Sequence, residues 1–140
     1  MNTIAGAEKM SIINESERQE FVAGFICATL WANAYGDTLT GEPPCEADED
    51  RLSDADRGKL TTFAGEFLAS NGEDISAAVG RGASWESLGG DLALTGAGHG
   101  TGFWDRGYGA VGDRLSEAAR GVGYFMVFVA IDGALDVQEG

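Results

Sequence analysis

Hydrophobic residues recur at helical spacing in the first quarter of the chain. Asn14 and Glu17 stand three positions apart just before this stretch, which is the pattern of a capping box at a helix N-terminus. Gly36 and Asp37 interrupt the spacing. We therefore predict a mostly buried helix from about residue 14 to about Tyr35, with an apolar face made of Phe21, Val22, Phe25, Ile26, Leu30 and Trp31.

A second helix follows after a break. Residues 36–52 contain two adjacent prolines, which fix φ and lack a backbone donor, so we predict an acidic connecting loop there. Ser53 is suited to be the N-cap of the next helix, with Asp56 at its third position. The Asn-Gly pair at 71–72 ends a helix whose apolar residues follow the i, i+3, i+4, i+7 rule: Leu60, Phe63, Ala64, Phe67 and Leu68.

The pattern is weaker between the second helix and residue 91, where we predict a short helix over 74–79 and a turn over 84–88. From residue 91 onward the chain reads as short extended pieces. Residues 92–95 and 101–104 are predicted to pair as a β-hairpin, joined by a glycine-rich bend that contains His99.

The last third of the chain predicts one helix and a second hairpin. The helix covers about 111–120, and the apolar, β-branched run 124–131 is typical of a central strand. An Asp-Gly turn at 132–133 then leads into an antiparallel partner at 134–137. The expected fold is α+β: N-terminal helices followed by a small antiparallel sheet of two hairpins, with one inserted helix.

Length and composition indicate one folded domain. The chain has 140 residues, 44% of them apolar, so we expect a single domain over 1–140, with residues 1–13 a candidate flexible extension. No apolar run approaches the roughly 18 residues of a membrane span, and we expect a soluble, intracellular protein. The spacing of Cys27 and Cys45 fits neither a metal site nor a disulfide scaffold, so we predict two thiols, no metal and no cofactor.

Net charge is the strongest compositional signal. The chain carries 23 acidic and 9 basic residues, a net charge of −14, which argues against direct binding to nucleic acid. The acidity is greatest in one segment, where only Arg51 and Arg57 offset seven carboxylates: Glu42, Glu46, Asp48, Glu49, Asp50, Asp54 and Asp56.

Two interpretations of this acidic segment stay open. It can be a solvated face that keeps the protein soluble, or part of a low-lysine composition typical of salt-adapted proteins. Alternatively, its carboxylates can imitate a phosphate array, since helix-borne carboxylates lie about 5–6 Å apart and B-DNA carries one charge per about 1.7 Å of its axis.

Residues 98–106, with the sequence GHGTGFWDR, form the most unusual segment. They combine the only histidine of the chain with Phe103, Trp104 and an acid–base pair, among three glycines. Glycine permits close approach or positive φ, while the two aromatic rings supply apolar area that fixes the segment. The spacing matches neither a Walker loop nor a dinucleotide-binding fingerprint.

A catalytic interpretation would pair His99 with Asp105 as a general base or ligand. A single histidine without a Cys, Ser or second His at a usable spacing makes no recognised catalytic set. The favoured interpretation is structural: His99 bonds across the hairpin tip, and Asp105 and Arg106 pair with backbone or with Asp113 and Arg114. We therefore assign no catalytic residue and retain His99, Phe103, Trp104, Asp105 and Arg106 as a candidate motif.

Several short motifs together carry a resemblance. They are ATLW at 28–31, GDL at 90–92, GHGTGFWDR at 98–106, GDRLSEA at 112–118 and DG at 132–133. The chain resembles a group of short phage and mobile-element proteins with a Gly-His-Gly-x-Gly-Phe-Trp-Asp-Arg signature, closely over the last fifty residues and loosely before them. At 90–94, where that group carries Gly-His-Asp-Phe-Trp, this chain has Gly-Asp-Leu-Ala-Leu, so a shared two-histidine site is not implied.

These observations favour a binding protein over an enzyme. We expect a phage or mobile-element protein that inhibits a host defence or nucleic-acid-processing complex, of the anti-CRISPR or anti-restriction type, by occupying a basic protein surface with its acidic segment. The alternative is a small enzyme or ligand-binding domain that uses the glycine-rich tip around His99. A homodimer also stays open, because the first helix carries more apolar surface than one face requires.

Overall fold

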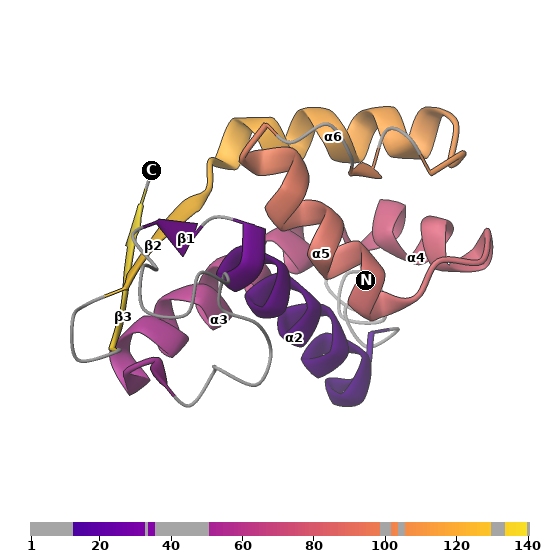
Figure 1. The fold of residues 1–140 in the computed structure, drawn as a ribbon. Coiled ribbons are helices and arrows are strands. Elements are labelled where there is room, and N and C mark those ends of the chain that lie inside the picture. Colours follow the sequence, from indigo (N-terminus) through magenta and orange to yellow (C-terminus); the bar gives the residue numbers. More distant parts are fainter. Residues whose placement is uncertain are drawn as a thin grey trace.

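The computed structural model describes residues 13–32, 34–35, 51–98, 102–103, 106–129 and 134–139. These residues form five helices: α2 (Glu15–Ala32), α3 (Asp54–Ser70), α4 (Gly72–Gly80), α5 (Trp85–Gly96) and α6 (Ala110–Val122). Three strands accompany them: β1 (Ala34–Tyr35), β2 (Phe125–Val129) and β3 (Leu135–Glu139). Figure 1 shows the sheet at one end of the molecule, beside α3, and α4 at the opposite end.

The strands form one sheet in the order β1-β2-β3. The two residues of β1 run parallel to β2, with Ala34 opposite Val127, and β3 runs antiparallel, with Val137 opposite Val127. The predicted antiparallel pairing of the last two strands is therefore confirmed, while the Asp-Gly turn at 132–133 lies outside the described residues.

The predicted starts of α2 and α3 are confirmed by their capping contacts. The backbone N–H of Asn14 donates to Glu17 Oε1 at 2.9 Å, and the N–H of Glu17 donates to Asn14 Oδ1 at 2.8 Å, which is the reciprocal capping box. At α3, Ser53 Oγ accepts from the N–H of Asp56 at 3.1 Å. The end of α2 was placed too late, since the helix stops at Ala32.

The predicted first hairpin is wrong, because residues 92–95 belong to α5. Ser84 caps this helix by accepting from the N–H of Ser87 at 3.1 Å, and Leu88 and Leu92 are fully buried one turn apart. Every residue from 91 to 95 is buried, so the helix shows no polar face there and its sequence resembles a buried strand. The fold remains α+β with one antiparallel strand pair, and the described residues contain no second hairpin.

An aromatic core joins α2 and α3 to the sheet and to the segment before α6. The ring of Phe67 stacks between those of Phe21 and Phe103, with centroid distances of 6.5 and 6.2 Å. The ring of Phe25 lies 5.3 Å from that of Phe63, which meets Phe125 of β2 edge-on at 5.0 Å. These contacts give the described elements one shared hydrophobic core.

Helices α2 and α5 cross at very short range. A Cβ added to Gly24 would overlap the carbonyl oxygen of Glu86, and one added to Gly89 would overlap the carbonyl oxygen of Phe21. Each helix thus places a glycine against the backbone of the other.

Among the described residues, no helix is both long and apolar enough to cross a membrane.

Candidate functional site

The acidic segment lies mostly outside the described residues. Five of its seven members belong to that part: Glu42, Glu46, Asp48, Glu49 and Asp50. Of the other two, Asp54 is exposed in the first turn of α3, whereas Asp56 is buried. More than half of the net charge of −14 falls on residues that the structure leaves undescribed.

Asp56 has a structural position between α3 and the sheet. Its Oδ2 accepts a hydrogen bond from the backbone N–H of Val137 at 3.1 Å, and its Oδ1 lies 3.3 Å from Lys59 Nζ. Only 8% of the residue is exposed. Asp56 therefore adds little to any exposed negative surface, although the sequence placed it in the acidic set.

The other exposed carboxylates of the described residues are spread over every helix and β3. They are Glu15 and Glu20 on α2, Glu66 on α3, Glu73 on α4, Glu86 on α5, Asp113 and Glu117 on α6, and Asp136 and Glu139 on β3. Glu15 forms an ion pair with Arg18 at 3.5 Å. By contrast, the sequence of residues 42–50 contains five carboxylates and no basic residue.

The glycine-rich segment is described only in part, since His99, Trp104 and Asp105 lie outside the described residues. Phe103 is fully buried in the aromatic core, and its backbone N–H donates to Thr95 Oγ1 at 3.2 Å. A Cβ at Gly102 would overlap Thr95 Oγ1, and its φ of +153° is also unfavourable for other residues. These contacts support the structural interpretation for this part of the motif.

Arg106, the last residue of the motif, pairs with Asp91 of α5. Its Nε and Nη2 both donate to Asp91 Oδ1, at 3.2 and 2.9 Å. The Asp91 side chain is 2% exposed, while that of Arg106 is 42% exposed. The side-chain partner of Arg106 is thus Asp91 and not the expected Asp113, and no sequence motif links Arg106 to a residue 15 positions earlier.

Tyr108 completes this cluster beside the ion pair. Burial of the phenol, followed by the negative charge of Asp91, raises the pKa of Tyr108 above its ordinary value of 10.0, while Arg106 acts in the opposite direction.

A shallow groove of about 460 Å³ runs beside the Arg106–Asp91 pair, and Cys27, Ser87 and Asp91 are among its lining residues. Cys27 is present as a half-buried thiol, and Cys45 lies outside the described residues.

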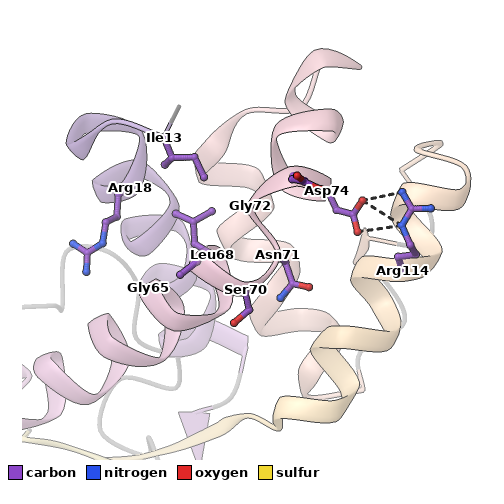
Figure 2. A pocket seen from close by; sticks show the side chains of 11 residues that line it. Ile13, Arg18, Gly65, Leu68, Ser70, Asn71, Gly72, Asp74 and Arg114 are labelled. Atoms are coloured by element: carbon purple, nitrogen blue, oxygen red, sulfur yellow. Dashed lines mark hydrogen bonds and ion pairs between the residues drawn. The ribbon is translucent and has the colours of Figure 1, made fainter. Parts of the chain in front are cut away.

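A larger pocket, of about 660 Å³, lies where α3 turns into α4. Figure 2 shows Arg18 on one side and the Asp74–Arg114 pair on the other. Leu68 and Gly65 of α3 are among its lining residues. Its size is within the range of small-ligand sites.

The Asp74–Arg114 pair joins α4 to α6 at the rim of this pocket. Arg114 donates from Nη2 to Asp74 Oδ1 at 2.8 Å and from Nε to both carboxylate oxygens, at 3.2 and 3.1 Å. The hydrogen bonds and charge of Asp74 raise the pKa of Arg114. No sequence motif predicts this pocket, because its lining comes from four separate helices, from Asn71 between α3 and α4 and from Ile13, which precedes α2.

Comparison with known proteins gives no match: no protein-family model, no curated protein and no solved structure is similar to this chain. Among the described residues, no group of three His, Cys, Asp or Glu side chains could hold a metal ion.

Proposed function

We propose that this protein acts by binding a basic surface on another protein, of the kind that otherwise holds nucleic acid, and thereby inhibits that partner. The net charge of −14 is the observation that carries the proposal. The specific form we favour is a phage or mobile-element inhibitor of a host defence or nucleic-acid-processing complex in the host cytoplasm. Residues 42–50 and Asp54 are the proposed contact residues.

The position of the acidic segment in the chain supports this role. It leads directly into α3, whose start is fixed by the buried Leu52, the Ser53 cap and the contact from Asp56 to Val137. The segment is therefore continuous with a helix whose start is held by three contacts. Charged groups presented in this way raise association rates, and the effect weakens as salt rises.

The location of the charge can be tested with two variants of equal net charge. In the first, Glu42, Glu46, Glu49 and Asp54 become Lys. In the matched control, four exposed carboxylates elsewhere become Lys: Glu20, Glu66, Glu86 and Glu117. Each variant is immobilised, and proteins retained from nuclease-treated host lysate are identified at about 50 mM and about 500 mM salt.

We expect the wild type and the control to retain one basic nucleic-acid-binding protein at low salt, and the first variant to lose it. Circular dichroism should show the same helix content in all three proteins. Equal loss in both variants would mean that overall charge, not the segment, drives the association. Retention by both variants would remove the acidic segment from the interface.

The pocket at the α3–α4 corner favours a second candidate function, the binding of a small ligand. Ala69 lines the pocket and is exposed, so a Trp there would fill it without disturbing the core. Ala77 is exposed on α4 away from the lining and gives a matched control. Native mass spectrometry should show a bound small molecule in the wild type and Ala77→Trp but not in Ala69→Trp; a wild type without one contradicts this candidate.

A further inference from the structure

Strand β3 lies at the edge of the described sheet. It pairs with β2 on one side, in the order β1-β2-β3. In an antiparallel strand, the backbone groups of alternate residues point to opposite sides. The N–H of Val137 is directed to Asp56 of α3, so Val137 is one of the residues whose backbone faces away from β2.

Such an edge is a template for another strand, and native proteins protect it. Here a second copy of the same chain would fit well. Val137 is the central residue of Leu135–Glu139, so two β3 edges can pair antiparallel about it with two-fold symmetry.

The side chains of β3 give little protection against that pairing. In a pair centred on Val137, Asp136 stands opposite Gln138 and Glu139 stands opposite Leu135, so no two carboxylates oppose each other directly. Gln138 Nε2 already donates to Asp136 Oδ2 at 2.7 Å within one chain, which shows that these two side chains are compatible neighbours.

We propose that Asp56 closes this edge and keeps β3 from pairing with β3 of a second copy. Its carboxylate takes the one N–H around which a symmetric pair would form. The acceptor is charged, which makes the hydrogen bond stronger than a neutral one. The ammonium group of Lys59, 3.3 Å from Asp56 Oδ1, helps to hold the carboxylate in place.

This role differs from that of an ordinary helix residue. At the third position of α3 an acidic side chain often serves only the helix dipole. In this protein the same side chain accepts a hydrogen bond from the backbone of β3, from a residue 81 positions later in the sequence. Without Asp56 as its partner, the Val137 N–H would be left to donate to water or to the carbonyl of another strand.

Two variants separate the edge contact from the stability of α3. Asp56→Ala removes the contact to Val137, whereas Ser53→Ala removes the helix cap and leaves that contact in place. Light scattering over about a hundredfold range of concentration reports association. Hydrogen exchange of the Val137 amide, measured by NMR in the dilute proteins, reports the edge itself.

We expect Asp56→Ala to form dimers or larger species as concentration rises, and its dilute form to exchange the Val137 amide about tenfold faster than the wild type. The wild type and Ser53→Ala should stay monomeric. Equal association of Ser53→Ala would show that fraying of α3 is the cause, and a monomeric Asp56→Ala with unchanged exchange would overturn the proposal.

Asp56→Asn keeps the test valid if the alanine variant fails to fold. The amide oxygen can still accept from Val137, but the negative charge is gone, so the variant should stay monomeric with Val137 exchange about threefold faster. Unchanged exchange in this variant would also overturn the proposal, as would a wild type that is already a dimer through β3.

Discussion

Replacing Gly89 with alanine tests the closest contact in the fold. The added Cβ would overlap the carbonyl oxygen of Phe21 and lie 2.9 Å from the backbone nitrogen of Phe25, both on α2. These are backbone atoms of a helix, so no side-chain rotation can relieve the overlap. The two helices must separate by about 1 Å to restore ordinary contact distances.

This separation of the two helices determines how much stability the Gly89→Ala variant loses. Overpacking of a well-filled site costs about 1–3 kcal/mol. A radial gap of about 0.5–1 Å also removes a quarter to a half of the dispersion energy of flanking contacts, and Phe21, Phe25, Leu88 and Leu92 are all buried at this crossing. The higher helix propensity of alanine offsets about 1 kcal/mol of this destabilisation. We expect a net destabilisation of about 2–4 kcal/mol.

Gly58→Ala is the matched control, because it makes the same change in α3 with nothing within 4 Å of the new Cβ. It should stabilise the protein by about 0.5–1 kcal/mol. Urea unfolding followed by circular dichroism measures both free energies. If the two variants change stability in the same direction, the close approach of α2 and α5 is not the reason for glycine at position 89.

Three further outcomes follow from contacts already described. Arg106→Met should lower the free energy of unfolding in urea by about 2–3 kcal/mol, a value between those for exposed and buried ion pairs. The reason is that Asp91 stays buried, whereas Arg106 is partly exposed. A decrease of less than about 0.5 kcal/mol would contradict this expectation. In an absorbance titration Tyr108 should ionise at higher pH than an ordinary tyrosine, because its pKa is raised. The folded state holds the phenol proton more tightly than the unfolded state does. The stability that Tyr108 contributes is therefore complete below pH 10.0 and is lost as pH rises through the raised pKa. An ordinary titration of all tyrosines would refute it. Asn14→Ala should cost about 1 kcal/mol through loss of the capping box with Glu17, and no change in urea unfolding would mean that the box adds nothing to the stability of α2.

The elements that the sequence predicted well are those defined by local chemistry. The Asn14–Glu17 box and the Ser53 cap each need only residues three positions away, and both form as expected. The pairing of β2 with β3 was also predictable, because a β-branched apolar run and a short Asp-Gly connection leave few other arrangements.

Helix α5 could not be recognised, because long-range packing decides its conformation. Two adjacent glycines and a buried run without a polar face reduce any helical signal. Gly89 is required by the backbone of α2, a segment more than sixty residues earlier in the chain. A single sequence contains no record of that contact.

The same limit applies to the candidate sites. Asp91 was not singled out beside Arg106, because nothing local links a residue of α5 to one 15 positions later. The pocket at the α3–α4 corner is assembled from α2, α3, α4 and α6, so it exists only after these helices pack. Asp56 was correctly placed at the third position of the second helix, but its contact to Val137 depends on the packing of α3 against the sheet.

The ion pairs of the folded body decide which carboxylates are left to attract a partner. Glu15, Asp56, Asp74 and Asp91 each lie beside an Arg or Lys, and the field of such a pair falls off faster than that of a single charge. Residues 42–50 have no basic residue among them. Long-range attraction of a basic surface should therefore depend on that segment more than on the paired carboxylates of the helices. The two lysine-substituted variants carry the same net charge and differ in where carboxylates are lost, so equal salt sensitivity of their partner binding would show that the position of the charge does not direct the attraction.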